Sequence, residues 1–194
     1  HTMERYFVLE DTMEITDKIA QDVMKNVMKY AKILKKDPEN YEARAEIMWC
    51  GSLSHNGLTG CGTCGGDWAT HLMEHELGGM FDVAHGAGLA AVWGSWARYV
   101  MDEKPERFAQ FAVDVMGVEE SDDVKSTALK GIEAVEEFYR MIEMPTNMKE
   151  LGINPTDEQI KDMAMKATNH DTQQLGAFKK LSAKDLVEIY KTAK

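Results

Sequence analysis

The chain has 194 residues, which is enough for one domain or a small pair of domains with a real hydrophobic core. Apolar residues make up 44% and charged residues 28%, as in an ordinary globular protein, and the formal net charge is −11. Because phosphate binding needs a basic surface, this charge argues against a nucleic acid partner. The sequence has no run of about eighteen apolar residues, so we expect no membrane span.

Cysteine usage and the first residues both bear on the cellular compartment. The chain has three cysteines, an odd number, which indicates a reducing cytoplasm rather than a disulfide-linked scaffold. The first residues, HTMERYF, lack the apolar region and the cleavage site of a signal peptide. The chain begins with His1 rather than Met, so we expect either a tag remnant or a fragment of a longer protein. These features predict a cytoplasmic protein.

The first third of the chain has the pattern of two helices followed by a loop. Apolar residues recur every four positions from Ile15 onward, which predicts an amphipathic helix of about twenty residues that stops at Asp37-Pro38. A second helix is expected over residues 41–56, with Cys50 facing inward. The segment 57–66, GLTGCGTCGG, has five glycines and is typical of a tight loop.

The next two helices carry the histidines. Asp67 is expected to be the N-cap of a helix that contains His71 and His75, and Gly78-Gly79 is expected to end it. Another helix starts near His85 and runs to about Met101. This helix is apolar nearly all round, which is the pattern of a buried helix, and we place it at the centre of the fold.

The remainder of the chain is also helical. Pro105 suits the first turn of a helix, and residues 122–141 repeat the amphipathic pattern. Thr156 is expected to cap a helix, and Ser182 caps the last one, with Asp185 three residues later in the pattern of a capping box. No strand pattern is visible, so we predict an all-α multi-helix bundle of roughly seven to nine helices.

Three of the six histidines, His71, His75 and His85, fall within fifteen positions of one another. His71 and His75 are four residues apart and therefore share one face of a helix. The Gly-Gly break after them allows His85 to fold back toward His71. Imidazole is a common ligand of zinc and iron, so this cluster is a candidate metal site, with structural or surface histidines as the open alternative.

The cysteines offer a competing site. Cys61 and Cys64 form a C-x-x-C sequence and, with His71 and His75, could hold a structural zinc in a non-catalytic helical module. Only six residues separate Cys64 from His71, against about twelve in a zinc finger. A redox pair would need a helix N-terminus in a βαβ setting, and no strand is predicted. Two ordinary thiols in a loop, and a helical interaction protein without metal, stay open as well.

The run H-L-M-E-H-E-L-G-G-M-F-D-V-A-H-G-A-G-L-A closely resembles the signature of the iron-containing (group III) alcohol dehydrogenases, in their butanol-dehydrogenase-like branch. The family pattern is His-x-x-x-His-x-Leu-Gly, with His-Gly placed fourteen residues after the first histidine. His71 and His85 are fourteen apart here, and the sequence from His75 to Gly78 matches the middle of the pattern. The stretches MWCGSLSHNGLTG and GGDWATH are also similar to this family, so the resemblance spans nearly the whole chain.

The resemblance implies roles for four histidines. Residues 1–194 would be the helical, metal-binding catalytic domain of such an enzyme, with His71 and His85 as metal ligands. His1 precedes a stretch similar to the one that follows a further ligand in the family, so it is implied to be a metal ligand too. The aspartate ligand would lie four residues before this chain begins. His75 matches a non-ligand histidine near nicotinamide and substrate, which implies proton relay or substrate positioning.

The resemblance also implies cofactors and partners. The metal would be a divalent ion, Fe²⁺ or Zn²⁺, and NAD(P) would bind an N-terminal α/β domain that is absent from this chain. Gly65-Gly66-Asp67 is too short for the phosphate-binding loop of such a domain. The substrate would be a small alcohol or aldehyde, with Trp68 and the glycine loop as walls of its cleft, and the enzyme a homodimer. We expect the fragment alone to be inactive.

Overall fold

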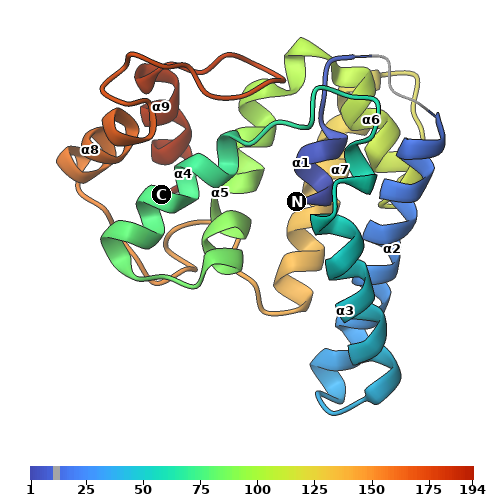
Figure 1. Cartoon of the computed structure of the whole chain (residues 1–194). Helices are drawn as coiled ribbons and strands as arrows, with labels where there is room; N and C mark the ends of the chain where they lie inside the picture. Colours follow the sequence, from blue (N-terminus) through green and yellow to red (C-terminus); the bar gives the residue numbers. More distant parts are fainter. Residues whose placement is uncertain (11–13) are drawn as a thin grey trace. The chain divides into compact units, whose positions relative to one another are not determined.

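Figure 1 shows the computed structural model of the chain, which describes residues 1–10 and 14–194. Nine α-helices and two short 3₁₀ helices form the regular structure of this described part. No β-strand occurs among the same residues, where one isolated bridge joins Leu175 and Leu181. The all-α prediction is therefore confirmed. None of the described helices is long and apolar enough to cross a membrane.

The chain divides into two compact units. Unit 1 comprises residues 1–67 and 104–134, and unit 2 comprises residues 68–103 and 135–194. The helices, in chain order, are α1 (Thr2–Tyr6), α2 (Glu14–Lys36), α3 (Tyr41–His55), η1 (Leu58–Gly60), α4 (Ala69–Phe81), α5 (His85–Val100), η2 (Met101–Glu103), α6 (Pro105–Asp114), α7 (Val124–Met141), α8 (Asp157–Ala167) and α9 (Ala183–Ala193).

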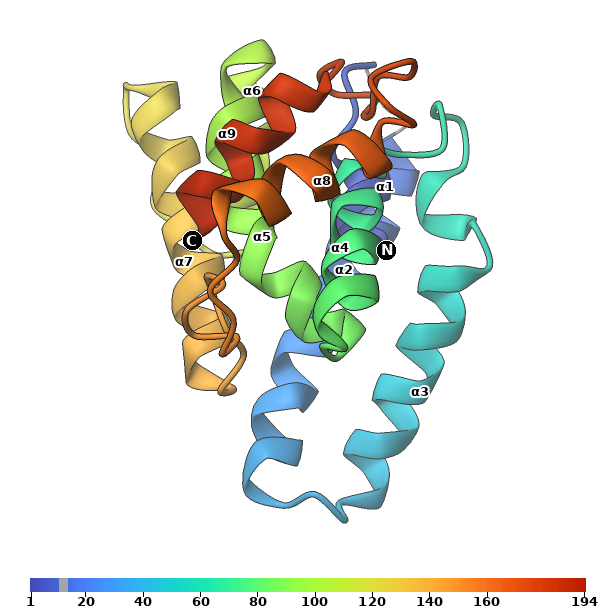
Figure 2. The ribbon, with the colours of Figure 1, turned by 90° about the vertical axis from the view of Figure 1, so that its left-hand side faces the viewer.

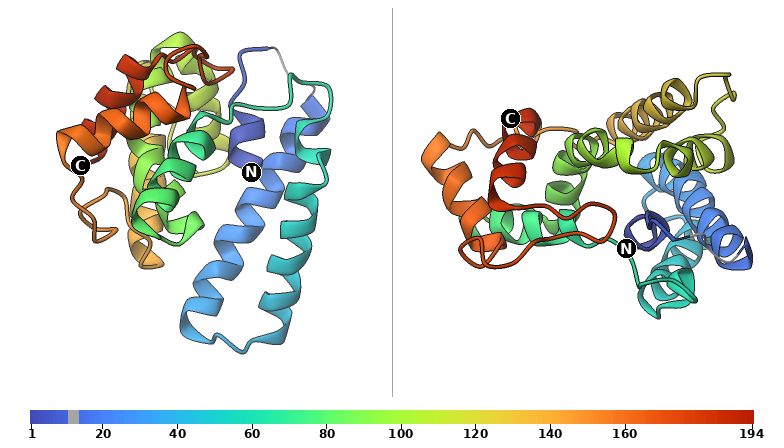
Figure 3. Two further views of the ribbon diagram at one scale, coloured as in Figure 1. Left: turned by 60° about the vertical axis from the view of Figure 1, so that its left-hand side comes forward. Right: turned by 90° about the horizontal axis from the view of Figure 1, so that it is seen from above.

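In unit 1, the two long helices α2 and α3 lie side by side and are joined by a short turn (Figure 3). Pro38 lies in that turn, two residues after the end of α2 at Lys36, and proline has no N–H with which to continue a helix. Asn40 is the N-cap of α3, and its side chain accepts a hydrogen bond from the Ala43 N–H at 3.0 Å. Cys50 is buried in α3, as the sequence predicts.

The inward face of α2 differs from the predicted one at its start. Ile15 is 62% exposed, whereas Asp17 is 7% exposed. The Arg107 guanidinium in α6 donates to both carboxylate oxygens of Asp17, at 2.6 and 2.7 Å. It also donates to the Tyr6 carbonyl at 2.9 and 2.7 Å, and burial raises the pKa of the Tyr6 hydroxyl to about 12. At the start of α2, the inward-facing side chain is therefore that of Asp17, in a bidentate ion pair, and not the apolar side chain of Ile15.

In unit 2, the most apolar helix of the chain, α5, packs against both α4 and α9 (Figure 2). Residues on several sides of α5 are fully buried, among them Ala91, Val92 and Ala97. α8 in turn contacts α4 and α9. The expectation of a buried helix after His85 is confirmed, and it is the helix that carries the core of unit 2.

Both ends of α4 differ from the sequence prediction. Trp68, not Asp67, is the N-cap, and its side chain makes no capping hydrogen bond. Asp67 is fully buried, and its backbone N–H donates to the Glu4 carbonyl at 2.8 Å within unit 1. The Gly-Gly pair does not end the helix, which continues to Phe81. Asp82 takes the left-handed conformation at the C-cap, with φ of 53°, which a short polar residue tolerates better than most.

The sequence pattern gives no sign of α1, and the structure shows why. This helix spans a single turn, Thr2–Tyr6, which is too short to display a 3.6-residue period. Its position is set by tertiary contacts rather than by its own propensity: Tyr6 is buried, and its carbonyl accepts from Arg107.

The two predicted caps near the C-terminus are confirmed as complete capping boxes. Thr156 and Gln159 cap α8 reciprocally, and Ser182 and Asp185 do the same for α9. The Tyr99 hydroxyl of α5 donates to Asp185 Oδ1 at 2.6 Å, and this hydrogen bond raises the pKa of Tyr99 to about 12. Burial favours the neutral carboxyl of Asp185, but hydrogen bonds from Ser182 and Tyr99 outweigh it and lower the Asp185 pKa.

Asp185→Asn is expected to lower the free energy of unfolding by about 1 kcal/mol at neutral pH, because it removes the charge and one of the two oxygens that accept from Ser182 and Tyr99. Folding lowers the Asp185 pKa, so its stabilisation is present above the usual value of 3.8 and is lost as the pH falls through the folded value. Denaturant unfolding from about pH 7 to about pH 3 should therefore show a difference that shrinks at the acid end. A difference that stays constant with pH would contradict this assignment.

Two helical glycines in unit 1 make a matched pair. A Cβ added to Gly51 in α3 meets nothing within 4 Å, so Gly51→Ala is expected to raise the free energy of unfolding by about 0.5–1 kcal/mol. A Cβ on Gly131 in α7 would lie 2.5 Å from the Ala112 Cβ of α6, so Gly131→Ala should lower it by about 1–3 kcal/mol. Urea unfolding of both variants checks the packing of α6 on α7, and effects of the same sign would contradict it.

Candidate metal centre

The three clustered histidines lie together in unit 2. His71 and His75 are one turn apart on α4, and His85 is the first residue of α5, after the short connection that follows Asp82. The ring centroids of His71 and His85 are 5.0 Å apart, those of His75 and His85 are 5.7 Å apart, and those of His71 and His75 are 6.0 Å apart. The turn between α4 and α5 therefore folds His85 back toward both other rings.

The cluster is open to solvent on one side and closed on the other. His71 is 8% exposed, whereas His75 and His85 are exposed. The Trp68 ring meets the buried side at an edge-on angle, with its centroid 5.3 Å from that of His71. A small ion or ligand can reach the cluster from the side of His75 and His85, while the indole and the core of unit 2 cover His71.

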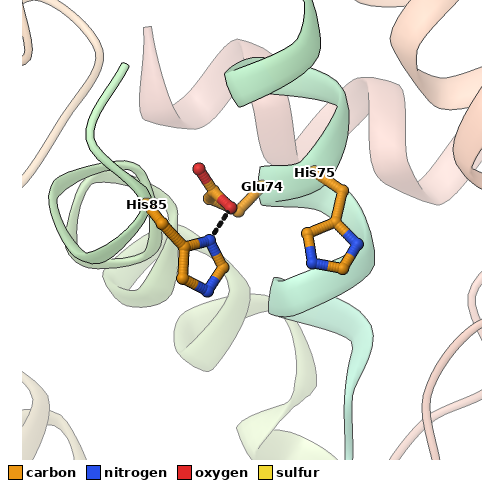
Figure 4. Close-up of side chains that lie close together, drawn as sticks. All are labelled: Glu74, His75 and His85. Carbon is orange, nitrogen blue, oxygen red and sulfur yellow. Dashed lines mark hydrogen bonds and ion pairs between the residues drawn. The ribbon is translucent and has the colours of Figure 1, made fainter. Parts of the chain in front are cut away.

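The structure adds a residue that the sequence reasoning missed. Glu74 lies between His71 and His75 on α4, and its side chain is 2% exposed. Its Oε2 forms a hydrogen bond with Nδ1 of His85, as the dashed line in Figure 4 shows. Ligand atoms of Glu74, His75 and His85 all lie within 4.8 Å of one another. One carboxylate and two imidazoles therefore converge on one region, with the third imidazole beside them.

The position of α4 in unit 2 is fixed by a hydrogen bond from α9. The Tyr190 hydroxyl donates to the Met73 carbonyl at 2.7 Å, and Tyr190 and Met73 are both fully buried. Burial, followed by the negative charges of Glu76 and Glu74, raises the pKa of the Tyr190 hydroxyl well above 10, so it remains a donor. Met73 lies between His71 and His75 on α4, so this hydrogen bond holds the turn of the helix that carries both histidines.

His1 belongs to unit 1, where it is the N-cap of α1. Its ring lies 4.0 Å from the ring of His55, the last residue of α3, centroid to centroid. The role of His1 as a metal ligand stays a prediction.

The cysteines of the C-x-x-C sequence lie in the loop of unit 1. Both Cys61 and Cys64 are exposed free thiols, and neither one begins an α-helix. Burial and a hydrogen bond with Glu10 raise the pKa of the Cys64 thiol, against the lowering effect of a backbone hydrogen bond at Gly66. A thioredoxin-like redox pair needs a helix N-terminus next to a strand, and the described residues provide neither at Cys61 and Cys64.

Comparison with known proteins shows the family to which this chain belongs. The model of the Fe-containing alcohol dehydrogenase family, C-terminal, matches residues 1–194. The chain belongs to this family. It is 32% identical over 192 residues to NADH-dependent butanol dehydrogenase A of Clostridium acetobutylicum, and 30% identical over 195 residues to the NADPH-dependent aldehyde reductase YqhD of Escherichia coli.

Solved structures of the family have the same fold. The crystal structure of NADH-dependent butanol dehydrogenase A from Thermotoga maritima superposes with a TM-score of 0.90 at 34% identity. It is matched over 100% of this chain and 49% of its own. The two relatives above are likewise matched over 98% and 100% of this chain but only 49% of their length. The chain therefore spans about half the length of the family members it matches.

The residues present fit the divalent metal that the family implies. Imidazole nitrogens and carboxylate oxygens are donors that zinc and iron share. Ligand atoms of Glu74, His75 and His85 converge here, and the His71 ring lies 5.0 Å from the His85 ring, centroid to centroid. Glu74 Oε1 is buried and has no hydrogen-bond partner among the described residues, which is unusual for a carboxylate outside a functional site. The family membership does not favour the alternative zinc module with Cys61 and Cys64.

Tyr190→Phe tests how α4 is held. It is expected to lower the free energy of unfolding by about 1 kcal/mol, because a buried hydrogen bond to the Met73 carbonyl is lost. Tyr41→Phe is the matched control, since Tyr41 is 84% exposed, and it should leave the stability unchanged. Urea unfolding of the two variants measures the difference. Equal effects would show that the Tyr190 hydroxyl does not hold α4.

Proposed function

We propose that this chain is the metal-binding, substrate-side half of an NAD(P)-linked alcohol dehydrogenase that interconverts small alcohols and aldehydes. The observation that carries the proposal is the convergence of His71, His75 and His85 in a chain that matches the iron-containing family over its whole length. The printed names of the relatives, butanol dehydrogenases and an aldehyde reductase, supply the substrate class.

In this proposal each histidine has its own task. His71 and His85 hold the metal, and His1 serves as a further ligand. A divalent iron or zinc ion bound there supplies a Lewis acid toward the substrate oxygen. His75 is exposed at the rim of the cluster, so it positions the substrate and passes its hydroxyl proton to solvent. Trp68 forms a wall of the substrate cleft beside His71.

The rest of the reaction needs a part that this chain does not contain. Hydride transfer requires a site for NAD(P), and the N-terminal domain of the longer enzyme supplies it in this proposal, together with the aspartate ligand. The match to only 49% of the length of the relatives supports this division. We propose that the 194 residues alone do not oxidise alcohols, and that the complete enzyme is a cytoplasmic homodimer.

Metal binding by the chain is the first test. Cobalt(II) added to the apo chain is expected to give the visible absorption of nitrogen and oxygen ligation, and zinc should displace it in a competitive titration. His71→Ala and His85→Ala should each lower the cobalt affinity by at least about tenfold, because each removes one of the proposed metal ligands. Cys61→Ser with Cys64→Ser is the control, and the affinity should not change.

Two results would overturn the proposal. A thiolate-to-cobalt charge-transfer band that disappears in the double cysteine variant would establish the zinc module with Cys61 and Cys64. Equal, weak binding by the wild-type chain and by His71→Ala would remove the metal from the function altogether. In the complete enzyme, alcohol-dependent reduction of NAD(P) should be lost in His71→Ala and retained in the cysteine variant.

A further inference from the structure

Glu74 is a buried acid of unit 2, beside the histidine cluster, and the proposed function gives it no task. Its side chain is 2% exposed on α4, and a carboxylate is expensive to bury unless it is paired and hydrogen-bonded. Its Oε2 is hydrogen-bonded with His85 Nδ1, whereas its Oε1 has no hydrogen-bond partner among the described residues. A purely structural carboxylate would be expected to have both oxygens satisfied, as Asp17 has with Arg107.

The protein makes room for this carboxylate on two helices. A Cβ added to Gly88 in α5 would lie 2.6 Å from Glu74 Oε1 and 2.7 Å from Glu74 Cγ, which real Cβ atoms do not approach. A Cβ on Gly78 in α4 would lie 3.2 Å from the same oxygen. Gly86, two residues earlier in α5, is not close to Glu74, since a Cβ there meets nothing within 4 Å. The absence of a side chain at Gly88 is thus specific to the place that Glu74 occupies.

His85 and Gly88 are three residues apart and share one face of the first turn of α5. Glu74 therefore touches α5 at two points of one turn: its carboxylate is hydrogen-bonded with the His85 ring, and its stem fills the space over Gly88. The hydrogen bond fixes the rotation of the imidazole, and the close packing fixes the carboxylate.

A neutral imidazole carries one N–H, and its other nitrogen has the lone pair that binds a metal. When Nδ1–H donates to a carboxylate, the tautomer is fixed and the lone pair lies on Nε2. We propose that Glu74 is a positioning residue that holds His85 in the Nδ1–H tautomer and presents Nε2 to the metal. This inference rests on the proposed function, because it presumes that His85 is a ligand. Metal-ligating histidines commonly depend on such an acceptor, and its loss lowers metal affinity by about 10–100-fold.

The tautomer can be measured without any metal and without any variant. Long-range ¹H–¹⁵N NMR spectra of the apo chain at about pH 8.5, where imidazole is neutral, distinguish the two protonated nitrogens of His85. We expect the Nδ1–H tautomer in the wild-type chain and in Glu74→Gln, whose amide oxygen can still accept. Glu74→Met should lose this preference. An Nε2–H tautomer in the wild-type chain would overturn the inference.

Metal affinity supplies the second readout, with cobalt(II) as the probe. Glu74→Met is expected to weaken binding by about 10–100-fold, whereas Glu74→Gln should recover most of the affinity because its amide keeps the hydrogen bond. Glu76→Gln and Glu76→Met are the matched controls on the same helix. These variants also remove one negative charge from α4, but they leave the hydrogen bond to His85 intact. They should therefore bind cobalt as tightly as the wild-type chain does.

A pair of glycine variants tests the same idea without altering Glu74. Gly88→Ala displaces the carboxylate from His85 and should weaken cobalt binding, whereas Gly86→Ala, one position removed from the ring, should not. This pair keeps the inference testable if Glu74→Met does not fold.

The outcomes separate the two levels of the argument. If the wild-type chain binds cobalt through His71 and Glu74→Met binds equally well, the positioning role fails and the proposed function stands. If Glu74→Gln loses as much affinity as Glu74→Met, Glu74 is itself a ligand, and the positioning role is wrong. If the wild-type chain does not bind cobalt, the proposed function fails, and the inference fails with it.

Discussion

The geometry of the histidine cluster depends on the close approach of α4 and α5 at Gly88. Because Gly88 has no side chain, the stem of Glu74 can lie against the first turn of α5 and reach His85. Tyr190 of α9 also holds α4, through the Met73 carbonyl. The helix that carries two of the histidines thus contacts both α5 and α9, and the third histidine is tied to it by the hydrogen bond with Glu74.

Two buried acids, Asp17 in unit 1 and Glu74 in unit 2, differ in a way that separates structure from function. In unit 1, Asp17 meets Arg107 with both carboxylate oxygens, and the guanidinium is further satisfied by the Tyr6 carbonyl. In unit 2, Glu74 has one oxygen on His85 and one without a hydrogen-bond partner among the described residues. A fully satisfied network specifies a fold, whereas a partly satisfied one is typical of a site whose partner is a ligand.

Much of the fold could be predicted from the sequence, because it depends on local chemistry. The caps at Thr156 and Ser182 follow from residues three positions apart, and the histidine cluster follows from helical spacing and a turn. The errors arise where distant contacts decide. The Asp67 backbone N–H donates to Glu4 and α4 begins after Trp68, and Asp82, not the Gly-Gly pair, takes the left-handed position at the end of α4.

Glu74 could not be singled out, because a glutamate beside two histidines on a helix usually faces water. The signal that could have pointed to it is Gly88, since a glycine inside a helix indicates a close approach of another group. Ile15 is the opposite case. The apolar period predicts that it is buried, but it is exposed, because the ion pair of Asp17 with Arg107 directs the neighbouring face of α2 toward α6.

The fit of Glu74 over Gly88 has a consequence for how the sequences of this family can diverge. Positions 74 and 88 share one volume, so a side chain at 88 requires a shorter one at 74, and a change at either alone is unfavourable. Position 86, with open space around it, carries no such constraint from within this chain. The two positions are therefore expected to vary as a pair, and a lineage that loses the glutamate becomes free to lose the glycine.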